Sequence, residues 1–443
     1  MRRLFGTDGV RGIANQELTP DLALALGRAA GRVLVPDGGE FVIGRDTRVS
    51  GPMLEGALVA GLCSAGVRVR LAGVVPSPAV AWLTIDESAR AGAVISASHN
   101  PVADNGIKFF SDLGTKIAEV DELAIEKAMT EEPPAPPTGT SVGSAEFLAD
   151  GADRYVAYLV ASLDESLRGL KIVLDCAHGA AWDVGPRAFR EAGADIVSIH
   201  DSPDGSRINV DCGSTSMARL SETVLSEGAD LGLAFDGDAD RVLAVDERGR
   251  PIDGDRIIGM TALRMLEKEE LHNDMVVVTV MSNLGFRRAL ERRGIEVVVA
   301  PVGDKYVVEA MTESGAVLGG EQSGHVIFGR HATTGDGVLT GLHVAVARAE
   351  EGRPLSEMVD FYKTFPQVLI NVETSGKDRL DESEDLWDEI KVAEAALGED
   401  GRVLVRASGT EPLVRVMVEA AEGAVAERVA NDLADSVRRH LGP

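Results

Sequence analysis

A recurring order of apolar and polar segments organises most of this chain. An apolar run at 41–43 leads into a polar loop, a helical stretch, a glycine turn at 65–67 and a second apolar run. The same order recurs at 171–199 and at 275–300. Runs rich in β-branched residues are typical of buried strands, and a glycine after a helix suits a left-handed cap. Three copies predict three related α/β domains, although strand–helix–strand units also occur without duplication.

Breaks in this pattern indicate the domain boundaries. The segment 131–138 (EEPPAPPT) cannot form regular structure, and 249–251 (GRP) follows an apolar strand as a second linker. From about residue 365 the apolar positions alternate in short runs, and a helix closes the chain near 425–440. We therefore predict α/β domains with mixed sheets at 1–150, 151–250 and 251–365, and a smaller α+β domain at 366–443.

Composition narrows the class of protein. The chain has 443 residues, 44% of them hydrophobic, which is a globular composition and too long for a single core. A formal net charge of −27 repels nucleic acid and anionic membranes, so a phosphorylated ligand needs local basic residues. There is no membrane-length apolar run or signal-peptide pattern, and the three cysteines have no metal-binding spacing. We expect a cytoplasmic protein that binds neither nucleic acid nor membrane.

The first chemical motif is the segment 96–101 (SASHNP), which follows an apolar strand. Ser98 lies at the strand end between a small residue and His99, where its hydroxyl can be approached by a ligand. Serine is a weak nucleophile that needs activation by its surroundings. Lys108 follows an Asn-Gly turn shortly afterwards. The alternative is an ordinary Ser-Asn-Pro turn beside an exposed histidine.

The second motif is 236–241 (DGDADR), with carboxylates at alternate positions between two apolar strands. Asp236, Asp238 and Asp240 could converge on one Mg²⁺ or Ca²⁺, and without a cation they would repel each other. An EF-hand is excluded because Arg241 replaces the required glycine and the flanks are typical of strands. A solvated acidic turn is the other alternative.

Two further loops carry polar groups. The segment 319–325 (GGEQSGH) could bind vicinal sugar hydroxyls, and its histidine could move a proton, although a structural glycine loop explains it equally well. The segment 406–412 (RASGTEP), with Arg415 downstream, could form an anion site of backbone N–H groups and two arginines, or a simple capped turn. No P-loop, HExxH or CxxC motif is present.

Together and in this order, the four motifs resemble those of the α-D-phosphohexomutase superfamily. The resemblance spans the chain from 5–12 (FGTDGVRG) to the last loop. The segments 302–307 (VGDKYV) and 321–325 (EQSGH) are similar to the corresponding segments in one branch of the superfamily. The enzymes of that branch act on glucosamine phosphates and supply UDP-N-acetylglucosamine for cell walls. This implies a mutase that interconverts glucosamine 6-phosphate and glucosamine 1-phosphate through a phosphoserine and a sugar 1,6-bisphosphate, with its active site in the central cleft.

The resemblance also implies residue roles. The implied catalytic residues are Ser98, Lys108, His99, Arg11, Arg241 and His325. The implied substrate-binding residues are Glu321, Ser323, His325, Asp304, Lys305, Arg406, Ser408, Gly409, Thr410 and Arg415. The implied metal ligands are Ser98, Asp236, Asp238 and Asp240. Ala239 departs from the superfamily pattern, which often has a glycine there, so backbone flexibility at this position is in question.

Cofactors and partners follow from the same resemblance. It implies one Mg²⁺ per chain, glucosamine or glucose 1,6-bisphosphate as activator, a phosphosugar substrate and a possible homodimer. The general base is left open among Lys108, His99 and His325. A phosphomannomutase/phosphoglucomutase is the alternative enzyme, and a non-catalytic Mg²⁺ or sugar-phosphate binding protein is the alternative of another class.

Overall fold

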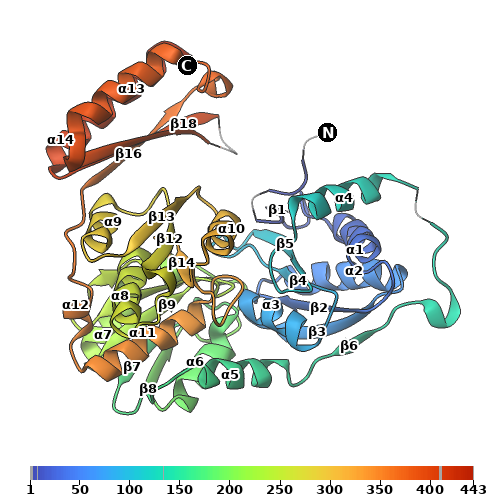
Figure 1. Cartoon of the computed structure of the whole chain (residues 1–443). Coiled ribbons are helices and arrows are strands. Elements are labelled where there is room, and N and C mark those ends of the chain that lie inside the picture. The colour runs from blue at the N-terminus through green and yellow to red at the C-terminus, as the bar shows by residue number, and fades with distance from the viewer. Residues whose placement is uncertain (1–2, 7, 133, 409–411, 443) are drawn as a thin grey trace. The chain divides into compact units, whose positions relative to one another are not determined.

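The computed structural model describes residues 3–6, 8–132, 134–408 and 412–442 of the chain. Two compact units make up the molecule. The larger contains Met1–Met281 and Ile295–Asp360, and the smaller contains Ser282–Gly294 and Phe361–Pro443. Within the described residues the larger unit has three mixed sheets and the smaller has one antiparallel sheet (Figure 1).

The first sheet has the strand order β1-β5-β4-β2-β3-β6. Its strands are β1 (Val10–Ile13), β2 (Glu40–Arg45), β3 (Arg68–Val74), β4 (Ala91–Ile95), β5 (Asp104–Ser111) and β6 (Ala145–Phe147). Strand β2 pairs in parallel with β3 and β4, whereas β5 runs antiparallel to both β4 and β1. Antiparallel β5 therefore returns the chain beside β4 after the loop that carries the Ser98 motif.

The second and third sheets contain the same arrangement. The second has the order β11-β10-β9-β7-β8, and the third has the order β13-β12-β14-β15. Their strands are β7 (Lys171–Asp175), β8 (Asp195–Ile199), β9 (Leu231–Phe235), β10 (Val242–Asp246), β11 (Pro251–Ile252), β12 (Met275–Thr279), β13 (Glu296–Ala300), β14 (Leu318–Gly320) and β15 (Val326–Phe328). In each sheet the first strand has two parallel neighbours, and an antiparallel strand follows. The predicted repeat of three α/β domains is thus confirmed.

This repetition places three motifs at equivalent positions. The turns β4–β5, β9–β10 and β14–β15 each connect the last parallel strand to its antiparallel neighbour. They contain the Ser98 segment, the acidic segment and the Glu321 segment respectively. The carboxyl ends of parallel strands lie at one edge of a sheet, which is where α/β proteins generally bind ligands.

Helices cover both faces of the first sheet. The helices of the larger unit are α1 (Pro20–Leu34), α2 (Gly51–Ser64), α3 (Ser77–Asp86), α4 (Glu119–Thr130), α5 (Gly151–Ala161), α6 (Ala181–Glu191), α7 (Ala218–Glu227), α8 (Gly254–Glu267), α10 (Asp304–Ser314), α11 (Gly337–Glu351) and α12 (Leu355–Met358). Apolar residues of α1, α2 and α4 pack with alternate strand positions such as Phe41 and Ile43 in one core. On the other face, Gly44 and Gly92 allow α3 to approach closely through Val80 and Thr84. Strand alternation decides which side chains meet which helix layer.

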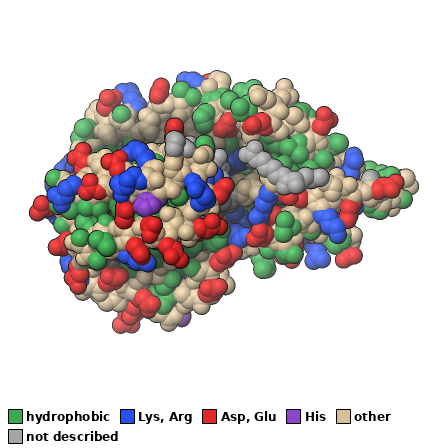
Figure 2. All heavy atoms as spheres, turned by 90° about the horizontal axis from the view of Figure 1, so that it is seen from above, with side chains coloured by type: hydrophobic (Ala, Val, Ile, Leu, Met, Phe, Trp, Pro, Cys, Tyr) green, Lys and Arg blue, Asp and Glu red, His purple; other side chains and the backbone are tan. Residues whose placement is uncertain are grey.

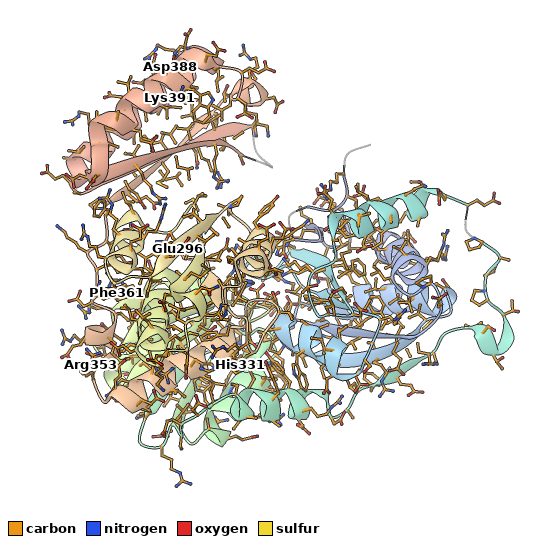
Figure 3. All side chains as sticks on the ribbon, in the orientation of Figure 1. Glu296, His331, Arg353, Phe361, Asp388 and Lys391 are labelled. Atoms are coloured by element: carbon orange, nitrogen blue, oxygen red, sulfur yellow. The ribbon has the colours of Figure 1, made fainter. Side chains whose placement is uncertain are left out.

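The smaller unit has the predicted α+β character. Its elements are α9 (Leu284–Glu291), β16 (Gln367–Glu373), α13 (Glu384–Leu397), β17 (Gly401–Ala407), β18 (Leu413–Ala420) and α14 (Gly423–Leu441). The central strand β18 pairs antiparallel with β16 and β17, and residues of α13 and α14 complete the core. Helix α13 carries the exposed ion pair of Asp388 and Lys391 on its outer side (Figure 3).

Local structure differs from the sequence prediction in two places. The segment 249–251 is part of a hairpin rather than a linker, because Pro251 opens β11, which pairs with β10. Helix α13 was not predicted, although its buried residues Leu386, Ile390 and Leu397 have the spacing of one helix face. The segment 131–138 has no helix or strand among its described residues, as predicted.

Surface properties match the charged composition. On the face shown in Figure 2, acidic and basic side chains are interspersed rather than separated into large patches. Within the described ranges, no helix has the length and apolar character required to span a membrane.

Candidate active site

Ser98 and the acidic segment meet across the first two sheets. The Ser98 hydroxyl donates a hydrogen bond to Oδ2 of Asp236 at 2.6 Å, although the two residues are 138 positions apart in sequence. The Ser98 carbonyl lies against Gly237, where a Cβ atom would approach that oxygen to 2.5 Å. Glycine is therefore required in the acidic loop at the point of contact with the serine loop. The serine motif and the acidic motif, which the family resemblance places in one set of metal ligands, lie together in the structure.

A buried arginine holds the serine loop in shape. Arg48 is fully buried, and its guanidinium donates to the carbonyls of Ser98, Asn100, Pro101 and Asp104 and to Asp46 at 2.5–3.0 Å. These five hydrogen bonds use every N–H that a guanidinium side chain carries. Such complete pairing stabilises Ser98 in its left-handed conformation, with φ of 51°.

Asp46 continues this support toward the nucleophile. Its carboxylate accepts from the Ser96 hydroxyl at 2.6 Å, and the oxygen of Ser96 accepts the backbone N–H of Ser98 at 2.9 Å. Burial raises the pKa of Asp46, and the charge of Arg48 opposes that effect. The hydrogen bonds that run from Arg48 through Asp46 and Ser96 to Ser98 hold the backbone of that serine in place.

The three aspartates form a group that fits a hard divalent cation. Their carboxylate oxygens lie within 4.8 Å of one another, and all three residues are buried. Among the described residues, Oδ1 of Asp238 and Oδ1 of Asp240 have no hydrogen-bond partner. Burial and the charges of Asp240 and Asp238 raise the pKa of Asp236 well above its usual value. Buried carboxylate oxygens with this mutual repulsion suit Mg²⁺, which prefers oxygen ligands.

The loop geometry also settles the question raised by Ala239. Ala239 has φ of 56°, in the left-handed region that favours glycine. An alanine adopts this conformation at a cost of about 1–2 kcal/mol. The loop therefore tolerates the departure from the superfamily pattern only because the surrounding contacts hold it in place.

Lysine and aspartate side chains of alternating charge form a row of ion pairs that begins at Asp238. Lys108 Nζ lies 3.1 Å from carboxylate oxygens of both Asp238 and Asp8. Lys116 then joins Asp8 to Asp304, with Nζ 2.6 Å from the Asp304 carboxylate. Burial would lower the pKa of Lys108, but the carboxylates of Asp238 and Asp8 raise it above its usual value. Lys108 is therefore held as a cation.

His99 lies beside the Ser98 hydroxyl, and Arg11 and Arg241 lie near enough to His99 to act on its charge. Arg11 pairs with Asp8 and donates to the Asn100 side chain at 3.4 Å. Nδ1 of His99 lies 3.2 Å from the Ser98 hydroxyl. Loss of hydration together with the charges of Arg241 and Arg11 lowers the pKa of His99 below its usual value. His99 therefore keeps a neutral ring between two cations.

His325 is buried and its ring nitrogens face defined partners. The N–H of Gly335 donates to Nε2 at 3.0 Å, and Nδ1 lies 3.7 Å from Oδ2 of Asp240. Burial lowers the pKa of His325, but Asp240 and Asp304 raise it overall. With Nε2 accepting the Gly335 N–H, a ring proton on Nδ1 faces Asp240.

The other residues of the sugar-loop prediction lie near this group. Glu321 is half-buried, accepts the Gly303 N–H at 3.1 Å and adds negative charge near Arg241. The Ser323 hydroxyl points to Glu321 at 3.4 Å. Lys305 follows Asp304 in the first turn of α10 and lines a cavity of about 360 Å³ with Lys116.

The predicted phosphate loop belongs to the smaller unit. Arg406 on β17 lies directly opposite Arg415 on β18, so two guanidinium groups share one face of the sheet. Burial and the charge of Arg415 lower the pKa of Arg406. Like charges at opposed strand positions are unfavourable unless an anion lies between them. Ser408 is buried at the start of the loop, and Gly409 and Thr410 lie outside the described residues.

Sequence reasoning missed several residues of this arrangement. They are Asp8, Asp46, Arg48, Lys116, Ser77 and Lys377. Ser77 donates to Asp238 at 2.5 Å, and Lys377 donates to the Ser408 carbonyl at 3.0 Å. Asp8 lies inside the 5–12 segment and Arg48 inside the polar loop after β2, so both had a sequence signal. Lys116 and Lys377 had none, because only tertiary contact brings Lys116 beside Asp8 and Asp304 in the larger unit and Lys377 beside Ser408 in the smaller unit.

Comparison with known proteins identifies close relatives over the whole length. Phosphoglucomutase/phosphomannomutase family models match residues 2–135 (alpha/beta/alpha domain I), 153–249 (domain II), 253–365 (domain III) and 369–436 (C-terminal domain). A phosphoglucosamine mutase of Nocardioides is 54% identical over 100% of both chains, and one of Streptomyces griseus is 53% identical with the same coverage. A phosphoglucomutase/phosphomannomutase family protein of Burkholderia thailandensis has a TM-score of 0.84 at 27% identity, covering 99% of this chain and 98% of its own.

Proposed function

Because this chain belongs to the phosphoglucomutase/phosphomannomutase family and groups with its phosphoglucosamine mutases, we propose that it interconverts glucosamine 6-phosphate and glucosamine 1-phosphate through phosphorylated Ser98. The observation that carries this proposal is the contact of the buried Ser98 hydroxyl with Asp236, beside Lys108 at Asp238. A nucleophile, an acidic triad and a fixed cation meet at one point, as phosphoryl transfer requires.

The reaction is a transfer in two directions. The phosphate on Ser98 moves to a free sugar hydroxyl: the P–Oγ bond breaks and a new P–O bond to the sugar forms, giving a 1,6-bisphosphate. The intermediate then presents its other phosphate to the Ser98 oxygen, and the reverse transfer regenerates phosphoserine. A sugar 1,6-bisphosphate would charge the dephosphorylated enzyme and act as activator.

Different residues around Ser98 stabilise charge and transfer protons. Lys108, held as a cation by carboxylates, and Arg11 stabilise the charge that develops on the phosphoryl oxygens. His99, neutral and within 3.2 Å of the Ser98 hydroxyl, is the group able to accept a proton. His325, whose Nε2 accepts an N–H, positions Asp240 rather than exchanging protons with substrate.

Asp236, Asp238 and Asp240 would hold Mg²⁺, with an oxygen of phosphorylated Ser98 as a further ligand. When bound, the ion neutralises charge on the transferring phosphoryl group. Ser77 and Lys108 already hold Oδ2 of Asp238, which leaves Oδ1 for a cation. Those contacts also keep the carboxylate oriented before the ion binds.

We expect Asp238→Asn to lower Mg²⁺ affinity by at least about tenfold, because the triad loses one of its three charges. Isothermal titration of the chelator-treated protein measures this. Asp246→Asn, which removes a carboxylate of the same hairpin outside the triad, is the matched control and should bind Mg²⁺ normally. Unchanged affinity in Asp238→Asn would mean that the acidic segment is only a turn.

The phosphate that is not reacting is assigned to the loop after β17. Arg406→Ala and Arg415→Ala should each raise KM for the phosphosugar about ten- to a hundredfold, since a charge-assisted hydrogen bond is worth about 1.5–3 kcal/mol. Steady-state kinetics with Lys391→Ala, an exposed cation of the same unit, provide the control. An unchanged KM in both arginine variants would remove the loop from substrate binding.

Substrate choice is assigned to the loop of Glu321 and Ser323, whose carboxylate and hydroxyl can bind vicinal ring hydroxyls. The test is kcat/KM for the 6-phosphates of glucosamine, glucose and mannose, with Mg²⁺ and trace sugar bisphosphate. We expect glucosamine to be preferred, glucose to be slower, and mannose, inverted at C2, to be poor. A higher value for mannose phosphate would favour the phosphomannomutase alternative and contradict this proposal.

We propose further properties of the protein from its membership in the family. They include the four domain boundaries, a cytoplasmic location, a homodimer and the placement of the active site in a central cleft. Asp304 and Lys305 are assigned to substrate binding, and the ion pair of Asp304 with Lys116 would keep that segment oriented.

A further inference from the structure

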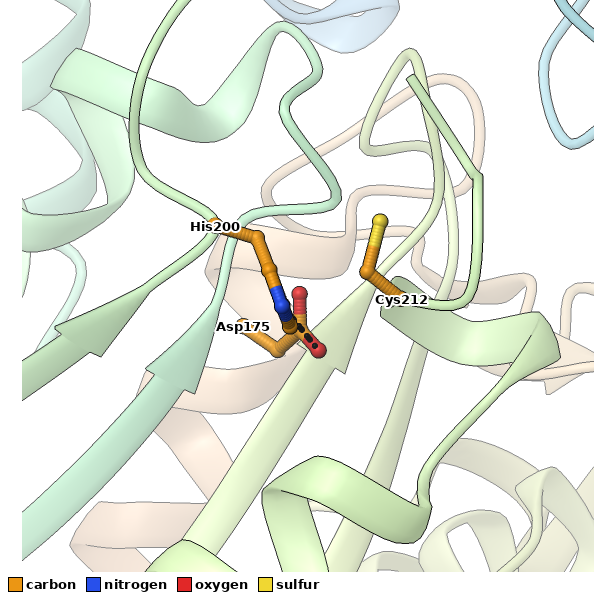
Figure 4. Close-up of side chains that lie close together, drawn as sticks. All are labelled: Asp175, His200 and Cys212. Atoms are coloured by element: carbon orange, nitrogen blue, oxygen red, sulfur yellow. Dashed lines mark ion pairs between the residues drawn. The ribbon is translucent and has the colours of Figure 1, made fainter. Parts of the chain in front are cut away.

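A second group of metal-ligating side chains lies in the second sheet, apart from the acidic triad. Strands β7 and β8 are parallel neighbours with Asp175 opposite Ile199, so Asp175 and the following His200 lie at the same sheet edge. Cys212 comes from the segment that crosses above that edge, directly before a short helical turn (Figure 4). One carboxylate oxygen, Nδ1 of the imidazole and the thiol sulfur all lie within 4.8 Å of one another.

The atoms that could bind an ion have few hydrogen bonds to the surrounding residues. Asp175 is fully buried, and its Oδ1 accepts the Ala177 N–H at 2.9 Å. Its other oxygen, Oδ2, lies 3.0 Å from Nδ1 of His200, yet within the described residues neither atom has a hydrogen bond of good geometry. The Cys212 thiol has a weak contact to the Arg207 carbonyl at 3.8 Å. The Asp175 carboxylate and the His200 imidazole thus form a partly buried ion pair, and the Cys212 thiol completes a group of three atoms that could bind one cation.

The chemistry of the three groups selects the kind of ion. Carboxylate, imidazole and thiolate are the ligands that Zn²⁺ takes in proteins, whereas Mg²⁺ avoids sulfur. An ionised Asp175 and an ionised Cys212 together balance a divalent charge, with His200 neutral. The His200 side chain is 24% exposed, so a water molecule can reach the fourth position of a tetrahedral ion.

We propose that Asp175, His200 and Cys212 form a structural site for a thiophilic divalent cation such as Zn²⁺. On binding, the Cys212 thiol releases its proton to solvent and coordinates as thiolate, while His200 coordinates through unprotonated Nδ1. No redox step is involved. The proposal does not depend on the mutase mechanism, because the hydrogen bonds and ion pairs described for these three residues do not include the Ser98 hydroxyl or the acidic triad.

The loops that such an ion would tie together support the serine loop. Asn209, just before Cys212, donates from Nδ2 to the Ser98 carbonyl at 2.9 Å and from its backbone N–H to the Ala177 carbonyl at 3.1 Å. Thr47 donates to the carbonyl of His178 at 2.5 Å. The ion would therefore stabilise the part of the second domain against which Ser98 is held.

Cobalt provides a direct test, because a thiolate ligand gives Co²⁺ a charge-transfer absorption that oxygen ligands do not. The full-length protein is stripped with a chelator, kept reduced without thiols, supplied with excess Mg²⁺ to fill the acidic triad, and titrated with Co²⁺. We expect one equivalent to produce charge-transfer and tetrahedral bands. Cys212→Ser should abolish the charge-transfer band, and Cys63→Ser, which alters a thiol in another domain, should retain it. Absence of the band in the wild type, or its persistence in Cys212→Ser, would overturn the proposal.

Zn²⁺ affinity gives a second readout in a variant that perturbs the core less. His200→Ala, at a partly exposed position, should lower Zn²⁺ affinity at least about tenfold in competition with a chromophoric chelator. Zn²⁺ should also raise the thermal midpoint of the wild type but not of His200→Ala. Equal affinity and equal midpoints would mean that Asp175 and His200 form only an ion pair beside an inert thiol. Asp238→Asn should bind Zn²⁺ at this site normally, which separates failure here from failure of the mutase proposal.

Discussion

Replacing Ser98 by alanine should lower kcat by at least about a thousandfold, because the phosphoryl group then has no covalent position on the enzyme. The variant should stay folded, since the Ser98 side chain is small and the backbone is held by Ser96 and Arg48. Initial rates with glucosamine 6-phosphate and sugar bisphosphate, compared at equal folded concentration, measure the effect.

Phosphopeptide mapping of the purified wild type provides the matching control. Ser96 is two residues away, but its hydroxyl is committed to Asp46 and to the Ser98 N–H. We expect phosphate on Ser98 and none on Ser96. Full activity in Ser98→Ala, or phosphate found at Ser96 instead, would refute the phosphoserine mechanism.

The second large effect concerns stability. Arg48→Met should destabilise the larger unit by about 3–5 kcal/mol, because it removes the cation paired with the buried Asp46 carboxylate and the guanidinium hydrogen bonds to four backbone carbonyls. Denaturant unfolding followed by circular dichroism measures this loss. Activity should fall as well at temperatures where the variant is folded, since the serine loop loses its support.

Arg45→Met is the matched control for Arg48. Arg45 is on the same loop, and its side chain is 20% exposed and lies 3.3 Å from Glu55. Partly exposed pairs of this kind contribute about 0–1 kcal/mol, so this variant should unfold close to the wild type. Comparable losses in the two variants would show that Arg48 has no special role in holding the loop.

Membership in the phosphohexomutase superfamily and the α/β fold class, both predicted from sequence, are confirmed. The repeat was visible because buried parallel strands give continuous apolar runs and a glycine follows the helix that connects them. Gly66 and Gly193 indeed have positive φ after α2 and α6. Helix α13 was missed although Leu386 and Ile390 are four positions apart, as on one face of a helix, because the prediction for this domain rested on its alternating strand-like runs.

The sequence did not predict that three of the motifs occupy the same place in three sheets. Short strands such as β14 (Leu318–Gly320) are too brief to produce a recognisable pattern. Their equivalence appears only when pairing and direction are known, since parallel and antiparallel neighbours cannot be distinguished along the chain. The assigned roles of Ser98, Lys108 and the other site residues stay predictions until the variants above are measured.

The sequence by itself determined which loops carry chemistry, because a serine, an acidic triad and an arginine pair are recognisable from residue type and spacing. Tertiary structure alone decided other partners: Asp8 for Lys108, Lys116 for Asp304, and Asp175 with His200 for Cys212. The physical reason is that charge, hydration and burial of a side chain depend on groups distant in sequence. A carboxylate becomes a metal ligand, an ion-pair partner or a scaffold according to what the fold packs against it.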